Sequence, residues 1–395
     1  MPMQLAYAST YPPRRCGIAT FTRDLAGATG DYRIVALQPP DGPAAYPSEV
    51  RHVIRRDRRA DYRRVAAELN RSDVRVVSVQ HEYGIWGGED GDAVLDFVSA
   101  LRIPVVTTLH TVPQNPTAGQ WRVLSQLVGA SAATIVMSTA AADLLGRTYD
   151  VDPRSVDVVP HGVPDLPLVD PDMVKPRLGF ATAPMILSFG LIGPGKGYEA
   201  VIEAMPAVVR ACPTAYYVIL GATHPELLRR EGEAYRTKLV GLAERLGVAN
   251  HVLFVNRFVT RAELGQWLTA ADIFVTPYPN RDQIVSGTLA YAMSAGKACV
   301  STPYAYAREV LDGGRGRLVD SGTPEAFAEA LRELIWNDGL RRLVGLKAYD
   351  YSRTMIWPAI GASYRRIFDR VAGIDMLALR DHVDHAAGAA HARAR

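Results

Sequence analysis

The sequence predicts an α/β protein built from two doubly wound domains, each a parallel β-sheet covered by helices on both faces. Short runs of apolar and β-branched residues alternate with helix-length segments, and after a proline-rich interruption the same alternation begins again. The runs are almost uniformly apolar, which is typical of strands buried on both faces of a parallel sheet. A chain of 395 residues also exceeds what one hydrophobic core usually supports.

Six strands are expected in each domain. They lie at residues 4–8, 32–37, 75–79, 105–109, 134–137 and 156–159, and then at 185–189, 216–220, 252–255, 273–276, 298–301 and 317–319. The stretch 160–177 between the two sets is rich in proline and predicts a linker. We therefore expect domains at residues 1–165 and 166–350. The Ala-rich end of the chain, within 373–395, predicts a flexible tail.

The charge balance argues against a nucleic-acid-binding protein. Lys and Arg number 44 and Asp and Glu 41, which gives a formal net charge of +3. Arginines do gather in residues 51–64 (RHVIRRDRRADYRR). Such a run is typical of the solvated face of a helix, and contact with an anionic lipid surface or an anionic acceptor is the alternative.

Cysteine usage and the N-terminus indicate a cytoplasmic protein without a bound metal. Cys16, Cys212 and Cys299 are far apart and show neither a disulfide framework nor metal-ligand spacing. The N-terminus lacks the basic and apolar regions of a signal peptide, and no apolar run is long enough to span a bilayer. We expect no metal and no cofactor, and the sequence does not indicate an oligomeric state.

The strongest local signal is the segment 185–204, MILSFGLIGPGKGYEAVIEA, in which a buried strand leads through a Gly-rich loop into a helix. Glycines such as Gly195 let the backbone approach an anion, and Lys196 supplies a positive charge at a helix N-terminus. The pattern predicts a phosphate site. Gly-rich turns of this kind also occur merely to pack a βα unit, and no Ser or Thr follows the lysine as in a P-loop.

Several motifs in a fixed order resemble the family-four glycosyltransferases. They are CGIATFTRDL at 16–25, TLHTVP at 108–113, VVPHGVPD at 158–165, GPGKG at 193–197, ADIFVTPY at 271–278, SGTLAYAMSAGKACVST at 286–302, and 306–331. The resemblance covers residues 3 to about 372. It implies a GT-B fold, in which two Rossmann-like domains face each other across a cleft. It also implies retaining, metal-independent transfer from a nucleoside diphosphate sugar to a hydroxyl acceptor, and a terminal helix at 351–372 that crosses back to the N-terminal domain.

The resemblance also implies roles for individual residues. Lys196 matches the lysine that neutralises the leaving phosphate, and His110 matches a histidine that contacts the donor sugar near the anomeric centre. Gly17 would bring its amide to the donor diphosphate, although a glycine there also fits packing alone. The amides at Ser286, Gly287, Thr288 and Leu289 open a helix that would cradle the diphosphate.

The loop 80–92, QHEYGIWGGEDGD, is the expected acceptor site. Glu82 offers a carboxylate to sugar hydroxyls, and Tyr83 and Trp86 offer rings on which a sugar face can stack. An ordinary exposed loop is the alternative reading. His161 takes the place of a common Asn in the hinge motif, and we expect it to brace the linker.

Three positions depart from the family pattern. Leu191 replaces an arginine, and Gln283 and Tyr291 replace two glutamates that contact the donor. Gln283 can still bind sugar hydroxyls, and Tyr291 can reach a ribose or stack on a base. The lost positive charge would need replacement by an arginine, for which the candidates are Arg14, Arg15, Arg257 and Arg281. The departures keep two alternatives open: a phosphorylase of the same fold and a catalytically silent sugar-binding protein.

Overall fold

The computed structural model describes residues 3–39, 45–181, 183–320 and 322–373. The chain divides into two compact units: unit 1 comprises Met1–Pro160 and Trp357–Arg395, and unit 2 comprises His161–Ile356. The expected boundaries, after residues 165 and 350, lie within a few residues of these. The expected flexible tail falls outside the described residues, apart from Gly373.

Unit 1 is built on a parallel sheet with the strand order β3-β2-β1-β4-β5-β6-β7. The strands are β1 (Leu5–Ser9), β2 (Tyr32–Gln38), β3 (Val50–Arg55), β4 (Val76–His81), β5 (Val105–Leu109), β6 (Ala133–Val136) and β7 (Val156–Val158). β1, β4, β5 and β6 are buried along their whole length. This burial confirms that the apolar runs form a sheet covered on both faces.

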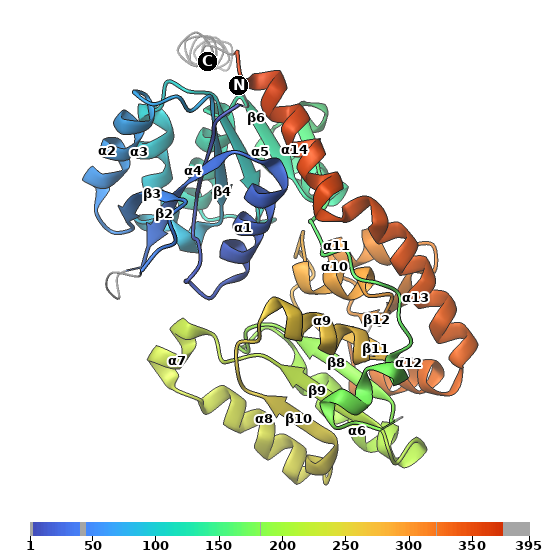
Figure 1. Cartoon of the computed structure of the whole chain (residues 1–395). Helices are drawn as coiled ribbons and strands as arrows, with labels where there is room; N and C mark the ends of the chain where they lie inside the picture. The colour runs from blue at the N-terminus through green and yellow to red at the C-terminus, as the bar shows by residue number, and fades with distance from the viewer. Residues whose placement is uncertain (1–2, 40–44, 182, 321, 374–395) are drawn as a thin grey trace, which may run out of the picture. The chain divides into compact units, whose positions relative to one another are not determined.

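The helices of unit 1 divide between the two faces of this sheet. They are α1 (Gly17–Thr29), α2 (Arg59–Leu69), α3 (Ala93–Ala100), α4 (Ala118–Gly129), α5 (Thr139–Tyr149) and α14 (Trp357–Val371), with short 3-10 turns at Tyr83–Ile85, Glu89–Gly91 and Pro153–Ser155. Figure 1 shows α1 and α14 on one face and α2 and α3 on the other. The arrangement is doubly wound, as expected.

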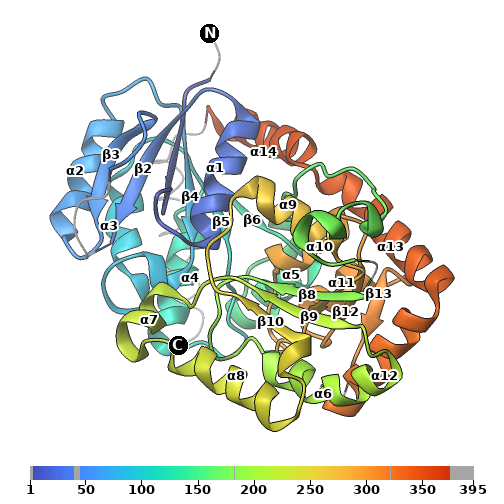
Figure 2. The ribbon, with the colours of Figure 1, turned by 60° about the horizontal axis from the view of Figure 1, so that its bottom comes forward.

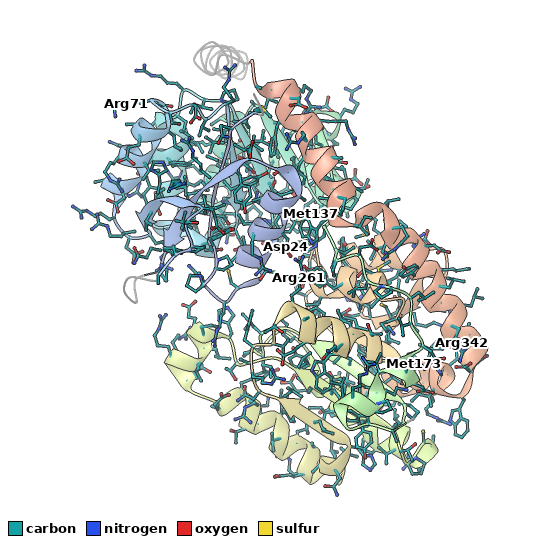
Figure 3. The ribbon with its side chains drawn as sticks, in the orientation of Figure 1. Asp24, Arg71, Met137, Met173, Arg261 and Arg342 are labelled. Carbon is teal, nitrogen blue, oxygen red and sulfur yellow. The ribbon has the colours of Figure 1, made fainter. Side chains whose placement is uncertain are left out.

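The sequence suggested that the Arg-rich run 51–64 forms one face of a helix, but the structure divides the run between two elements. Its first part forms the edge strand β3, and its second part begins α2. The arginines are largely ion-paired, for example Arg55 with Asp61 at 2.6 Å and Arg63 with Asp96 at 2.7 Å. Arg71, which follows the end of α2, lies on the outside of unit 1 (Figure 3). An edge strand such as β3 can carry charged side chains on its exposed side. The arginines therefore gave this segment the composition of a polar helix face and not that of a buried strand.

Unit 2 has a parallel sheet with the strand order β10-β9-β8-β11-β12-β13. The strands are β8 (Met185–Phe189), β9 (Tyr216–Leu220), β10 (Val252–Val255), β11 (Ile273–Thr276), β12 (Ala298–Ser301) and β13 (Gly316–Leu318). The helices are α6 (Tyr198–Ala211), α7 (Pro225–Glu231), α8 (Ala234–Arg245), α9 (Arg261–Ala270), α10 (Gly287–Ser294), α11 (Ala305–Leu311), α12 (Pro324–Trp336) and α13 (Asp338–Ser352), with 3-10 turns at Pro171–Met173, Lys175–Leu178, Ala249–His251 and Arg353–Met355.

Consecutive residues of the unit 2 strands pack into separate cores. Ile186 joins a cluster with residues of α6, α8 and α12, whereas the next residue, Leu187, joins a cluster with residues of α9 and α10. Figure 2 shows α6 beside α12 below the sheet. The sheet is therefore buried on both faces, and the expected two-domain α/β fold is confirmed in both units.

The linker belongs to unit 2 by packing. Lys175 is 2% exposed, and its ammonium group lies 2.7 Å from the Asp272 carboxylate, at the start of β11. Asp272 also accepts a hydrogen bond from the Met185 amide at the start of β8. The preceding residues are tied to the same unit, because the Val163 amide donates to the Met355 carbonyl at 2.9 Å and Asp165 pairs with Arg353 at 2.6 Å, so the boundary falls at residue 160 and not at 165.

The terminal helix α14 packs against α1 within unit 1. A Cβ atom on Gly361 would lie 2.4 Å from the Ala28 carbonyl oxygen, and the Tyr364 hydroxyl lies 3.1 Å from the Thr108 hydroxyl. Pro358 does not kink this helix. The chain breaks at the 3-10 turn Arg353–Met355, and Pro358 lies in the first turn of α14, where its missing N–H leaves no helical bond unmade.

Candidate active site

The Gly-rich loop of unit 2 has the backbone that the sequence requires. Gly190, Gly195 and Gly197 all have positive φ angles, of 136°, 85° and 71°. A Cβ atom on Gly197 would lie 1.9 Å from the Pro277 carbonyl oxygen. The loop between β8 and α6 is thus pressed against the segment that follows β11, and Gly197 is required for that approach.

Tyr278 joins the loop lysine to the N-terminus of α10. The Lys196 ammonium nitrogen lies 4.6 Å from the centroid of the Tyr278 ring, and the Tyr278 hydroxyl lies 2.8 Å from the Thr288 hydroxyl. The Thr288 hydroxyl is in turn 3.1 Å from the Ser286 hydroxyl. The structure therefore brings together Lys196, Ser286 and Thr288, which the sequence analysis selected separately.

The sequence analysis missed Tyr278 as a site residue. It occurs in the ADIFVTPY motif, where it reads as an ordinary residue after a strand. In the fold its ring is 5% exposed and stacks on Tyr304, with the ring centroids 5.4 Å apart. An aromatic face beneath an ammonium group holds that cation in place without neutralising it.

The N-terminus of α10 is capped by its own serine. Ser286 accepts a hydrogen bond from the Leu289 amide at 3.3 Å, and the Leu289 side chain is fully buried. Gly287 packs against the His161 ring, because a Cβ atom at Gly287 would lie 2.7 Å from Nε2 of that ring. His161 thus braces α10 as well as the linker, and burial lowers its pKa to about 4, so it is neutral at pH 7.

The three departures from the family pattern have different surroundings. Gln283 donates a hydrogen bond from its side chain to the Val285 carbonyl at 2.9 Å, which stiffens the segment before α10. Tyr291 is 8% exposed, and its ring packs against His161 and Phe189. Leu191 lies in the Gly-rich loop beside Gly190. Tyr291 is therefore mainly a core residue, with little of its ring open to a nucleotide.

Arg281 is the candidate arginine that lies beside the loop in unit 2. It lines a cavity of about 510 Å³ together with Gly195, Gly197 and Tyr278, and it donates a hydrogen bond to the Asp320 carbonyl at 2.6 Å. Arg257, by contrast, is paired with Glu263 at 2.8 Å. Arg14 and Arg15 belong to unit 1.

His110 lies just beyond β5 in unit 1 and is held by a buried glutamine. Its Nε2 atom is 2.9 Å from Oε1 of Gln80, and its backbone amide donates to the His81 carbonyl at 2.9 Å. The Phe21 ring from α1 packs edge-on against the imidazole, with the centroids 4.9 Å apart. The neighbouring strand β4 thus fixes the ring on one side and α1 fixes it on another.

The predicted acceptor loop supplies one partly buried carboxyl group and two buried rings. Glu82 accepts a hydrogen bond from the Gly84 amide through Oε1, and its Oε2 is buried without a hydrogen-bond partner in the described part of the chain. Burial raises the pKa of its carboxyl group. Trp86 is 2% exposed and donates to the Gln80 carbonyl. The expectation that Trp86 stacks on a sugar is therefore wrong, since neither face of its ring is open. Tyr83 is 9% exposed and donates to the Gln120 carbonyl.

Gly17 opens α1 and has no packing reason to be glycine. A Cβ atom there would meet nothing within 4 Å. The helix N-cap is Cys16, whose sulfur accepts a hydrogen bond from the Ala19 amide at 3.3 Å. Close packing within unit 1 therefore does not explain why this position is a glycine.

The described residues lack two features, a cluster of metal ligands and a membrane-spanning helix. Within residues 3–39, 45–181, 183–320 and 322–373, no group of three or more His, Cys, Asp or Glu side chains is arranged to hold a metal ion. Over the same residues, no helix combines the length and apolar character needed to cross a membrane.

Family models match both units. Residues 17–165 match the model described as "Glycosyltransferase Family 4", and residues 183–337 match "Glycosyl transferases group 1". The chain belongs to the family-4 glycosyltransferases. The matched segments contain His110, Lys196 and Ser286, and the resemblance seen in the sequence motifs is confirmed.

Similar proteins agree with this family. The chain is 30% identical over 291 residues to the D-inositol 3-phosphate glycosyltransferase of Xylanimonas cellulosilytica, covering 67% of this chain and 66% of that protein. It is 25% identical over 284 residues to the phosphatidyl-myo-inositol mannosyltransferase of Mycolicibacterium smegmatis, covering 70% and 67%. The glycosyltransferase thus spans 66% of the length of the first of these relatives.

Solved structures place this glycosyltransferase in the GT-B fold. Anabaena HepE in complex with UDP and glucose matches with a TM-score of 0.75 at 16% identity, covering 93% of this chain and 100% of that one. Sucrose-phosphate synthase from Thermosynechococcus elongatus matches with a TM-score of 0.74 at 16% identity, covering 93% and 98%. At this identity the likeness concerns the fold.

Proposed function

We propose that the protein transfers a glycosyl group from a nucleoside diphosphate sugar to a hydroxyl acceptor, with retention at the anomeric carbon and without a metal ion or cofactor. The observation that carries the proposal is the group formed by Lys196, Tyr278 and the N-terminus of α10. It joins a cation without a carboxylate partner among the described residues to a helix N-terminus, which together suit a leaving diphosphate. HepE, a neighbour in fold, binds UDP and glucose.

The chemistry required of this site is stabilisation of the departing phosphate. Negative charge grows on the β-phosphate as the glycosidic bond breaks, and Lys196 and the α10 amides would be strongest in that state. In a same-face displacement, a phosphate oxygen takes the proton of the acceptor hydroxyl, so no protein nucleophile is needed. Retention therefore requires no further side chain here. Arg281, which lines a cavity with Gly195 and Tyr278, would supply the second positive charge.

A cyclic polyol or sugar is the acceptor class that we infer for unit 1. Two of the relatives are named for acceptors that contain inositol. The Glu82 side chain is partly exposed just after β4, and its carboxyl group is the one that we assign to an acceptor hydroxyl. His110, just beyond the neighbouring strand, is the residue that we assign to the donor sugar near the anomeric centre.

The test is Lys196→Ala, with Lys238→Ala as the matched control. Lys238 also lies over a tyrosine ring in unit 2, with its nitrogen 5.9 Å from the Tyr235 centroid, but it is paired with Glu199. We expect Lys196→Ala to lower turnover by about 100-fold or more at an unchanged melting temperature, and Lys238→Ala to keep wild-type turnover. Nucleotide release from a panel of nucleotide sugars is the measurement. A loss of less than about threefold in Lys196→Ala would remove this lysine from the mechanism.

A phosphorylase of the same fold is the second candidate. Leu191 and the largely buried Tyr291 favour it, because both weaken contacts that a diphosphate and a ribose would need. The same assay separates the two reactions: a phosphorylase forms sugar 1-phosphate from inorganic phosphate and releases no nucleotide. A catalytically silent protein would bind a nucleotide sugar, seen as protection against thermal unfolding, and form neither product.

A further inference from the structure

Gln80 is a buried side chain whose amide nitrogen and oxygen each contact another side chain. It lies near the end of β4 and has no exposed surface. Its Nε2 donates to the Ser78 hydroxyl at 3.1 Å, and its Oε1 faces Nε2 of His110 at 2.9 Å. Its backbone carbonyl accepts from the Trp86 indole at 3.1 Å. The side chain is thus fixed at both ends.

These contacts decide which nitrogen of His110 carries the proton. The amide nitrogen of Gln80 faces Ser78, so the atom that faces His110 is the oxygen, which can only accept a hydrogen bond. With the amide in this orientation, Nε2 of His110 donates the hydrogen bond and carries the proton. In the neutral ring the lone pair then lies on Nδ1.

We propose that Gln80 is the positioning residue of His110: it holds the proton on Nε2 and sets the plane of the ring, so that Nδ1 is the basic atom toward the donor sugar. The inference rests on the proposed function for the role of His110. A residue that holds the second nitrogen of a functional histidine fixes both its tautomer and its orientation. Phe21 restricts the ring from α1 but does not select a nitrogen.

The strongest competing explanation is that Gln80 only fills the core beside Trp86. Two variants separate the explanations. Gln80→Met keeps the length and bulk of the side chain without its acceptor. Gln80→Glu keeps the acceptor but adds a charge that stabilises a doubly protonated His110. The control is Gln126→Met, an exposed position on α4.

For a positioning role, Gln80→Met lowers kcat about 10- to 100-fold with little change in KM. Gln80→Glu shifts the acid limb of the kcat/KM profile upward by about one pH unit or more. The control keeps wild-type values. Variants with wild-type kcat and an unchanged pH profile would overturn the proposal and leave the proposed function intact. If Gln80→Met does not fold, the pH profile of Gln80→Glu decides.

A second readout does not depend on catalysis. In the wild type, the Nε2–H of His110 should give a slowly exchanging cross peak in a proton–nitrogen NMR spectrum, identified by its loss in His110→Gln. Gln80→Met should abolish it. If the wild type transfers no sugar from any donor, the proposed function fails, and the NMR signal alone decides whether Gln80 holds this proton. A signal that persists in Gln80→Met overturns the assignment.

Discussion

His81 should make the protein sensitive to acid. The residue ends β4 with no exposed surface, and neither ring nitrogen has a hydrogen-bond partner among the residues that the structure describes. Burial lowers the pKa of His81 from 6.5 to about 3. The unfolded chain therefore binds a proton between these values that the folded chain does not, so stability is complete above pH 6.5 and falls as the pH drops toward 3.

The magnitude follows from the size of this shift. Each pH unit below 6.5 costs about 1.4 kcal/mol, and the full shift corresponds to about 5 kcal/mol. His81→Leu removes the titrating group and also removes two buried nitrogens that lack partners. We expect the variant to be at least as stable as the wild type at pH 7.5, because an unpartnered buried polar group is itself destabilising.

The assay is urea unfolding of the wild type and His81→Leu at several values between pH 4.5 and pH 7.5. The difference in unfolding free energy between the two proteins should grow in favour of the variant by about 2 to 3 kcal/mol between pH 6.5 and pH 4.5. Taking the difference cancels the carboxylates that titrate in both proteins. Equal pH dependence in the two proteins would refute the argument, and so would a variant that is less stable at every pH.

Two glycine substitutions give further tests. Gly17→Ala enters open space at the start of α1, so it should not destabilise the fold but should lower transfer. Gly27→Ala on the same helix also enters open space and should raise stability by about 0.5 to 1 kcal/mol, as alanine does in a helix interior, with transfer unchanged; equal activity in both variants would show that the Gly17 backbone does not approach the donor. Gly361→Ala places a methyl group against the Ala28 carbonyl, where α14 packs on α1, and should cost about 1 to 3 kcal/mol in urea unfolding; an unchanged midpoint would mean that the two helices separate freely.

Most of the fold could be predicted from the sequence because strands, turns and helices are each indicated by residues within one short segment. An apolar run followed by glycines and a helix pattern fixes a strand, a turn and a helix with few alternatives, and the β8–loop–α6 segment formed as expected. The signal failed where charge masked it. In β3 the arginines that pair with α2 lie on the exposed side of an edge strand, so the alternation resembled a polar helix face.

Assembly of the site depended on contacts between residues distant in sequence. Tyr278 joins Lys196 to Thr288, and nothing in the spacing of these residues indicates that its ring lies beneath the ammonium group. In the sequence, Gln80 resembles any other residue of a buried strand. Only the pairing of β4 with β5 shows that it lies beside His110. Trp86 looked like a platform for a sugar, but packing against Tyr62 and Phe97 buried its ring.

The sequence by itself determined the two α/β units, the Gly-rich loop with Lys196, and the family, because these depend on periodicity, backbone freedom and motif order within short segments. Only the tertiary structure decided which side chains share a hydrogen bond, which rings are buried, and which side chain faces Nε2 of His110. Those properties arise where parallel strands end side by side. Sheet order sets which loops meet there, and a single chain segment does not contain that information.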